Sequence, residues 1–393
     1  MPRHGENIRQ RKDGRWESRV FLGIYTKCGN PKYKYIYANT YKEVKIKSKE
    51  VIQKQDMGVN LTESSITVGA WLDKWLKEYK QNQIQPTTYE GYQYNIRHIK
   101  KALGRIKLED LKPDQIQHYI NEFKKENKLR TLKISHTLLS AALDQAVNND
   151  LIIKNPAKMV TLPKQVKKEA TVLTPAIQTL FIKALNGERL ENFFMFQLAT
   201  GMRPGEALGI QWGDIDYENK LLTIKGAIRK EKDENTGKHV LVFAPTKTKR
   251  SRSIELLDET IEILNKQKKI QDIEKKTLGE GYLDIDLVFC TQLGTMIDRD
   301  NLDVTLTRVK NKMKAIAAAE QGIDVSEVEI PDFTAHSLRH TFATRALEQD
   351  IPLKIVAEWL GHSTIRVTGD IYSHALPAKR RQSMEKLKGI FER

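Results

Sequence analysis

Residues 66–160 carry four apolar stripes at helical spacing, and this pattern favours a segment built from helices alone. An N-cap candidate, Thr67, precedes the first stripe. The members of that stripe are Trp71, Leu72, Trp75, Leu76 and Tyr79. Pro86 and Pro113 stand where they can open the second and third helices, because proline is tolerated in a first helical turn. The fourth stripe ends near Pro156, and we expect all four to form a core without chemistry of its own.

Residues 8–40 have the pattern of short strands. Turn signals at Asp13-Gly14 and Gly29–Pro31 separate the runs, and a helix is expected near 41–55. Three tyrosines alternate with lysines, namely Tyr33, Tyr35 and Tyr37. Because a strand points alternate side chains to opposite faces, the segment predicts a small core with one basic face.

A basic linker, Pro163–Glu169, leads into a mixed region with helices around 174–200 and 203–212 and more helices from Asp258 onward. Three strand-like runs lie between them, at 221–226, 239–245 and 252–256. A chain of 393 residues is too long for one ordinary core. We therefore expect three domains: a small α+β domain over 1–60, an all-α domain over 61–163, and a mainly helical α+β domain with a small antiparallel sheet over 164–393. Its last part, about 376–393, is expected to be a tail helix.

The excess positive charge lies in the first two-fifths of the chain. Residues 1–60 hold 14 basic and 6 acidic side chains, residues 61–167 hold 18 and 11, and residues 168–393 hold 34 and 33. The net charge of +16 favours a polyanionic partner, either nucleic acid or an anionic membrane. The sequence has no apolar run long enough for a signal peptide or a membrane span, which favours nucleic acid.

Only two cysteines occur, Cys28 and Cys290, and neither belongs to a metal-binding spacing. We therefore expect neither a disulfide nor a zinc site, and we expect the protein to lie in a reducing interior. These features predict a cytoplasmic protein.

Four short segments carry candidate chemistry. In the first, Pro204 suits the first position of a helix, which leaves Arg203 at an end where anions are favoured and Glu206 one turn away. The second, a turn between two strand-like runs, presents four basic residues: Lys247, Lys249, Arg250 and Arg252. Each segment alone has an ordinary interpretation, a salt bridge for the first and a solvated basic hairpin tip for the second.

In the third segment His336 and Arg339 share one helix face, so that both are able to reach one phosphate. In the fourth, His362 follows a glycine expected to end a helix, and Tyr372 lies ten positions later. Taken singly, a loop histidine and a half-buried tyrosine are most often structural.

Together the four segments resemble the tyrosine recombinase (phage integrase) family. The family pattern TGxRxxE, KT, HxLRHxxAT, LGH and YxH is met by Thr200–Glu206, Lys247-Thr248, His336–Thr344, Leu360–His362 and Tyr372–His374. The three-part layout is similar to that of integrases from temperate phages and conjugative transposons. Some members place the tyrosine nine residues after the GH histidine, whereas ten separate the two here, which we interpret as loop variation.

The resemblance implies a site-specific recombinase that integrates and excises a mobile element. Tyr372 is then the nucleophile that forms a 3′-phosphotyrosine, Arg203 and Arg339 bind the scissile phosphate, and Lys247 on a hairpin protonates the leaving 5′ oxygen. His336 assists proton transfer from the tyrosine, His362 donates a hydrogen bond to the phosphate, and Glu206 holds the cationic cluster together. The scheme needs no ATP, metal or other cofactor.

The same resemblance implies double-stranded DNA as partner, with arm sites bound by 1–60 and core sites by 61–163. It further implies a homo-tetramer on paired DNA sites, together with a directionality factor or DNA-bending protein.

A type IB topoisomerase shares the chemistry, but the basic module at 1–60 and the amphipathic tail favour a recombinase. A non-catalytic DNA-binding factor is disfavoured because no catalytic residue is missing. A metal-dependent transposase or relaxase is disfavoured because neither a spaced acidic triad nor an HxH pair occurs.

Overall fold

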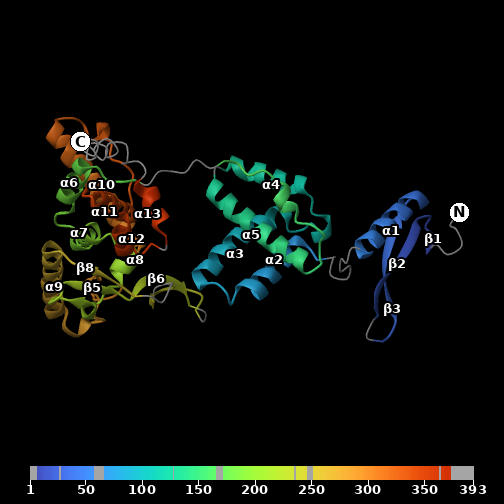
Figure 1. Cartoon of the computed structure of the whole chain (residues 1–393), viewed down its shortest axis with the longest axis horizontal. Coiled ribbons are helices and arrows are strands. Elements are labelled where there is room, and N and C mark those ends of the chain that lie inside the picture. Colours follow the sequence, from blue (N-terminus) through green and yellow to red (C-terminus); the bar gives the residue numbers. More distant parts are fainter. Residues whose placement is uncertain are drawn as a thin grey trace, which may run out of the picture. The chain divides into compact units, whose positions relative to one another are not determined.

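The computed structural model describes residues 7–25, 28–56, 66–126, 128–164, 171–233, 236–245, 251–362 and 364–372. The chain divides into two compact units, Met1–Val166 and Lys167–Arg393 (Figure 1). Lys247, Lys249, Arg250 and the expected tail helix at about 376–393 lie outside the described residues, as does the side chain of Tyr372. Within the described ranges, no helix combines the length and apolar character needed to cross a membrane.

The first unit begins with an antiparallel sheet in the order β1-β2-β3, as the alternating pattern predicted. Its strands are β1 (Ile8–Gln10), β2 (Trp16–Tyr25) and β3 (Pro31–Ala38), and α1 (Tyr41–Asp56) follows them. Val44 of α1 packs in a small core with Val20, Ile36 and Ala38 of the sheet. The register pairs Arg9 with Glu17, Glu17 with Tyr37, and Arg19 with Tyr35, so these side chains share the opposite face.

The rest of the first unit is helical. It contains α2 (Val68–Trp75), a π-helical turn η1 (Leu76–Lys80), α3 (Pro86–Leu103), the short η2 (Leu108–Asp110), α4 (Pro113–Lys125), α5 (Leu129–Asn148) and η3 (Pro156–Met159). The expected helix starts are confirmed, since the Thr67 hydroxyl accepts from the amide of Ala70 at 3.2 Å and both prolines occupy the first turn. The predicted stripes form one buried core, in which the Trp71 indole donates to the carbonyl of Ala142 at 2.8 Å.

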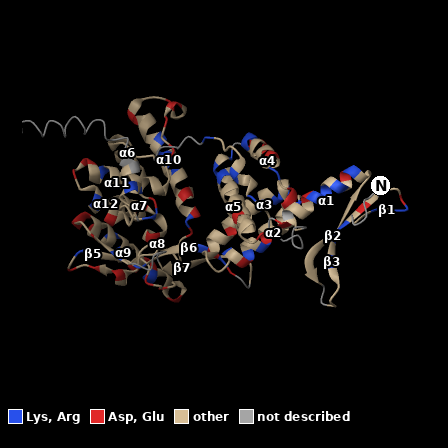
Figure 2. Ribbon diagram, turned by 45° about the vertical axis from the view of Figure 1, so that its right-hand side comes forward, with Lys and Arg blue, Asp and Glu red and all other residues tan. Residues whose placement is uncertain are grey.

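The second unit is mainly helical. Its helices are α6 (Pro175–Leu185), α7 (Glu191–Thr200), α8 (Pro204–Leu208), η4 (Trp212–Asp214), α9 (Asp258–Leu278), η5 (Gly279–Gly281), α10 (Asp300–Gln321), η6 (Val325–Glu327), α11 (Ala335–Glu348), α12 (Leu353–Leu360) and α13 (Ile365–Tyr372). Its core combines many leucines with a group of phenylalanines, among them Phe181, Phe193, Phe196 and Phe289. Figure 2 shows both signs of charge along these helices, consistent with the near-neutral balance of this half of the chain.

Five strands of the second unit form two small antiparallel sheets. One has the order β4-β5-β8, with β4 (Ile215–Asp216), β5 (Leu221–Ile224) and β8 (Arg252–Glu255); the other pairs β6 (Gly226–Lys232) with β7 (His239–Pro245). The expected hairpin between 239–245 and 252–256 is therefore wrong. Beta-strand β7 pairs along the full length of β6, and β8 returns to β5.

Gly226, the first residue of β6, lies where the chain leaves the first sheet. A β-carbon there would lie 2.4 Å from the ring of Phe243, so the chain passes close to β7 at the point where it leaves the first sheet.

Candidate active site

Arg203 and Glu206 meet across the first turn of α8. Pro204 occupies the first helical position, as the sequence predicted, and Arg203 precedes it as the N-cap residue. The Glu206 carboxylate accepts from the backbone amide of Arg203 at 3.2 Å and from its guanidinium at 2.8 Å. One glutamate thus fixes both the main chain and the side chain of this arginine.

Arg252, the first residue of β8, binds the same carboxylate from another element. Its two terminal nitrogens donate to Oε1 and Oε2 of Glu206 at 3.2 and 2.6 Å, a bidentate pair. The interpretation of this residue as part of a solvated hairpin tip is wrong, because α12 packs against β8 and covers it. Burial raises the pKa of Glu206, but the bonds and charges of Arg252 and Arg203 outweigh it and lower that pKa below the ordinary value.

Arg339 on α11 is buried, with 1 % of its surface exposed. It donates to the carbonyls of Gly201 at 3.0 Å and Leu360 at 2.7 Å. Burial, together with the charges of Arg203 and Arg252, lowers the pKa of Arg339 to about 9. Among the described residues no carboxylate forms a salt bridge with this guanidinium, so its charge is available to an anion.

Gly201 makes this arrangement possible at the end of α7. Its φ is +64°, and a β-carbon would lie 2.3 Å from the ring of Phe342. Only glycine combines the left-handed backbone with such close packing. The carbonyl that Arg339 binds is therefore held in place by the tight end of a helix.

Three histidines surround the arginines. The rings of His336 and His340, one turn apart on α11, meet edge to face with centroids 4.7 Å apart. Burial and the charge of Arg339 lower the pKa of His336, and burial with the charges of His336 and Arg339 lowers the pKa of His340 to about 4. Burial with Arg339 and Arg203 lowers the pKa of His362 to about 4. All three imidazoles are therefore neutral near pH 7.

His362 follows Gly361, which ends α12 in the left-handed conformation, as predicted. Its Nδ1 shares a 2.7 Å hydrogen bond with the hydroxyl of Thr368 on α13. Helix α13 ends at Tyr372, one turn beyond that threonine. The histidine and the tyrosine backbone are thereby linked through one short helix.

The structure thus brings Arg203, Glu206, Arg339 and His362 to one place, the C-terminal end of α12, with His336 on the neighbouring α11. Two contributors were not assigned from the sequence, Arg252 and Thr368. Thr368 carries no motif signal, but Arg252 does: it is the last of the basic residues, in a run that returns to alternating strand residues.

Comparison with known proteins decides the family. The model of the phage integrase family matches residues 167–379, and that of the phage integrase N-terminal SAM-like domain matches residues 67–124. The chain belongs to the phage integrase family. It is a tyrosine recombinase, an enzyme that cleaves and rejoins DNA strands. Its fold is accordingly the tyrosine recombinase fold, mostly helical with small sheets.

Relatives of this recombinase include proteins of mobile elements. A tyrosine recombinase XerC-like protein of Caldanaerobacter subterraneus subsp. tengcongensis is 30% identical over 374 residues, covering 91% of this chain and 92% of the relative. The transposase from transposon Tn916 of Enterococcus faecalis is 24% identical over 310 residues, covering 75% and 72%.

Two solved structures show the same fold. The Tn1549 transposon integrase in complex with a circular intermediate DNA has a TM-score of 0.68 at 21% identity, covering 82% of this chain and all of that one. A lambda integrase tetramer bound to a Holliday junction has a TM-score of 0.57 at 18% identity, covering 94% and 96%.

Proposed function

We propose that this recombinase integrates and excises a mobile element, with Tyr372 as its nucleophile and Arg203 and Arg339 as the ligands of the scissile phosphate. The observation that carries the proposal is the convergence of both guanidiniums on successive carbonyls, Leu360 and Gly361, directly before His362. The described contacts leave N–H groups on both side chains for an anion. Guanidiniums fixed before the phosphate arrives suit a transition state that gains negative charge.

The step balances as a transesterification. The Tyr372 hydroxyl oxygen bonds to phosphorus while the bond from phosphorus to the 5′ oxygen breaks, which leaves a 3′-phosphotyrosine and a 5′-hydroxyl. Neutral His336 accepts the tyrosine proton, Lys247 gives a proton to the 5′ oxygen, and His362 donates to the phosphate. Attack by a 5′-hydroxyl reverses the step, so rejoining needs no ATP.

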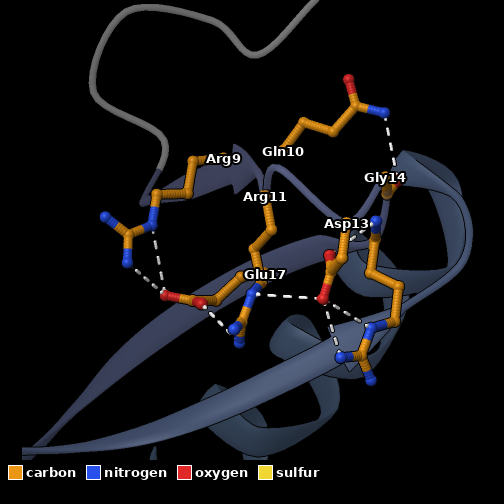
Figure 3. A network of polar contacts seen from close by, with 7 residues as sticks. Arg9, Gln10, Arg11, Asp13, Gly14 and Glu17 are labelled. Carbon is orange, nitrogen blue, oxygen red and sulfur yellow. Dashed lines mark hydrogen bonds and ion pairs between the residues drawn. The ribbon is translucent and has the colours of Figure 1, made fainter.

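We propose that residues 164–393 form the catalytic domain. Two further modules bind DNA in this proposal, residues 1–60 at arm sites and residues 61–163 at core sites. Support for the arm module comes from the open face of its sheet, where the side chains of Arg9 and Arg11 converge on Glu17 (Figure 3). Arg11 and Arg19 also lie over the rings of Tyr37 and Tyr33. Such a face offers both phosphate ligands and stacking groups.

We further propose a homo-tetramer on two paired DNA sites, assisted by a directionality factor or a DNA-bending protein. The lambda integrase tetramer on a Holliday junction supports this assembly by its shared fold.

Covalent attachment to DNA tests the nucleophile. The probe is a nicked duplex made from DNA that flanks the gene, and the readout is a protein–DNA band that survives SDS. We expect the native chain and Tyr217→Phe, which alters an exposed tyrosine of the same unit, to form the band. Tyr372→Phe should not form it. A band with Tyr372→Phe would assign the nucleophile to another residue.

A further inference from the structure

Three consecutive carbonyls at the end of α12 are each bound by a different arginine. Arg252 donates to Trp359 at 3.1 Å, Arg339 to Leu360 at 2.7 Å, and Arg203 to Gly361 at 3.2 Å. The two carbonyls before them, of Ala357 and Glu358, accept from the amides of His362 and Gly361. The carbonyls that a helix end leaves unpaired are thus bound in full, and they carry the negative end of the helix dipole.

Arg252 differs from the other two arginines in how its charge is used. Its bidentate pair with Glu206 compensates the charge directly, whereas Arg339 binds only neutral carbonyls in the described residues. The side chain of Arg252 is 18% exposed, whereas that of Arg203, which shares Glu206 with it, is 41% exposed. Arg252 is therefore placed to hold protein groups, while Arg203 stays open to a phosphate and Arg339 keeps a charge that no carboxylate pairs with in the described residues.

The guanidinium of Arg252 also packs against the turn that carries His362. A β-carbon on Gly361 would lie 2.8 Å from its central carbon, so a side chain there would displace the guanidinium, and the φ of +62° favours glycine in addition. The other end of β8 contacts the same helix, because the Trp359 indole donates to Glu255 at 2.9 Å. Side chains at both ends of β8 therefore contact the C-terminal end of α12.

We propose that Arg252 is a positioning residue, which sets Arg203 and His362 at their working distance by joining Glu206 to the end of α12. This inference rests on the proposed function of those two residues. Arg252 acts on one side through the carboxylate that it shares with Arg203, and on the other through Trp359 and Gly361. It does not touch DNA itself.

A split between cleavage rate and DNA affinity tests the proposal. The full chain with Arg252→Gln or Arg252→Lys is compared with the native chain on the nicked duplex, by single-turnover cleavage and by equilibrium binding. We expect cleavage to slow by about 10- to 100-fold, as for a small misplacement of reacting groups, while the Kd for DNA stays within about threefold. Arg308→Gln on α10 is the matched control, since it removes a guanidinium that is 60% exposed and paired with Glu188, and it should leave both quantities unchanged.

Chemical rescue adds a readout that a merely structural residue does not give. Guanidinium ion at low millimolar concentration should restore cleavage by Arg252→Ala, because it can refill the space between Glu206 and Trp359, and sodium chloride of equal strength should not. A double variant of Glu206→Gln with Arg252→Gln should be no slower than the slower single variant, since both break one network.

Three results would overturn the inference. Parallel loss of affinity and rate would make Arg252 a DNA ligand, native rates in both variants would remove any role, and additive effects with Glu206→Gln would separate the two residues. If Arg252→Ala fails to fold, Arg252→Lys, which retains the positive charge, provides the comparison. If any of these results is found while the native chain still forms the covalent band, only the role of Arg252 is refuted. A band from Tyr372→Phe would instead refute the proposed nucleophile.

Discussion

Each unit of this recombinase has a buried glutamate between two arginines, and the two clusters differ in what else the arginines touch. Glu17 accepts from Arg9 at 2.9 Å and from Arg11 at 3.5 Å on the open face of the N-terminal sheet (Figure 3). Glu206 accepts from Arg203 and Arg252 at the end of α12. Both carboxylates are over nine-tenths buried, so the difference lies in the arginines.

The side chains of Arg9 and Arg11 are 75% and 40% exposed, and their described partners are side chains alone. Arg203 and Arg252 also bind backbone carbonyls, which cannot move without moving a helix. Exposed arginines around a fixed carboxylate suit phosphates of varied position, as DNA binding requires. Arginines bound to the backbone suit a single geometry, as catalysis requires.

We call Arg203, Glu206 and Arg252 the rigid cluster, and Arg9, Arg11 and Glu17 the exposed cluster. The largest expected effect follows from replacing an arginine of the rigid cluster. Arg203→Lys keeps the charge but cannot hold Glu206, Gly361 and a phosphate together. We expect single-turnover cleavage to fall by about 10²- to 10³-fold, the usual loss for one donor to a developing charge. Binding to the duplex, measured in parallel, should change by less than about threefold.

Arg9→Lys supplies the comparison, because it makes the same replacement in the exposed cluster and should leave cleavage at the native rate. If Arg203→Lys lost affinity and cleavage equally, Arg203 would have a docking role and the contrast between the clusters would disappear.

A second expected effect concerns local stability. Glu206→Gln leaves the guanidiniums of Arg203 and Arg252 without a carboxylate, and the cost of breaking a buried pair suggests a loss of about 3 kcal/mol. Glu17→Gln leaves no arginine as buried as Arg252, since Arg9 and Arg11 are 75% and 40% exposed against 18%, and a loss of about 1 kcal/mol is expected. Native-state hydrogen exchange of the full chain, followed on peptides spanning 16–25 and 204–208, measures each opening free energy. Equal losses would show that exposure of the arginines does not distinguish the clusters.

Local rules predicted much of what positions these clusters. Proline at the start of α8, threonine before α2 and glycine after α12 each have a short-range cause, and each was found where the sequence placed it. The spacing of Glu206 and Arg203 likewise fixed which residues share a turn. Such features depend on neighbours within four positions in the chain, so a pattern reveals them.

Features that depend on distant pairing were not predicted. The run 239–245 pairs with the preceding strand rather than the following one, and strand alternation carries no information on the choice of partner. Arg252 was interpreted as solvated because its chain neighbours are basic, yet a helix more than a hundred positions later covers it. Burial of a charged residue is a tertiary property, and a local charge run is a poor guide to it.

The smallest expected effect tests the exposed cluster through salt. Each phosphate that a cation neutralises releases counterions, so the logarithm of the binding constant falls with the logarithm of salt concentration by about 0.9 per contact. If Arg9 meets one phosphate, Arg9→Ala should lower that slope by about one, and affinity by less than about tenfold near 0.1 M salt. The measurement is a titration of the full chain on a duplex of arbitrary sequence at several salt concentrations.

Arg252→Gln is the matched control for this titration, since its guanidinium is held by Glu206 and Trp359 and should release no counterion. A slope unchanged by Arg9→Ala would mean that the open sheet face does not contact DNA. A slope lowered by both variants would mean that Arg252 reaches a phosphate, and the rigid cluster would then resemble the exposed one. A change confined to Arg9→Ala is the outcome that separates an arginine free to follow DNA from one that holds the protein in shape.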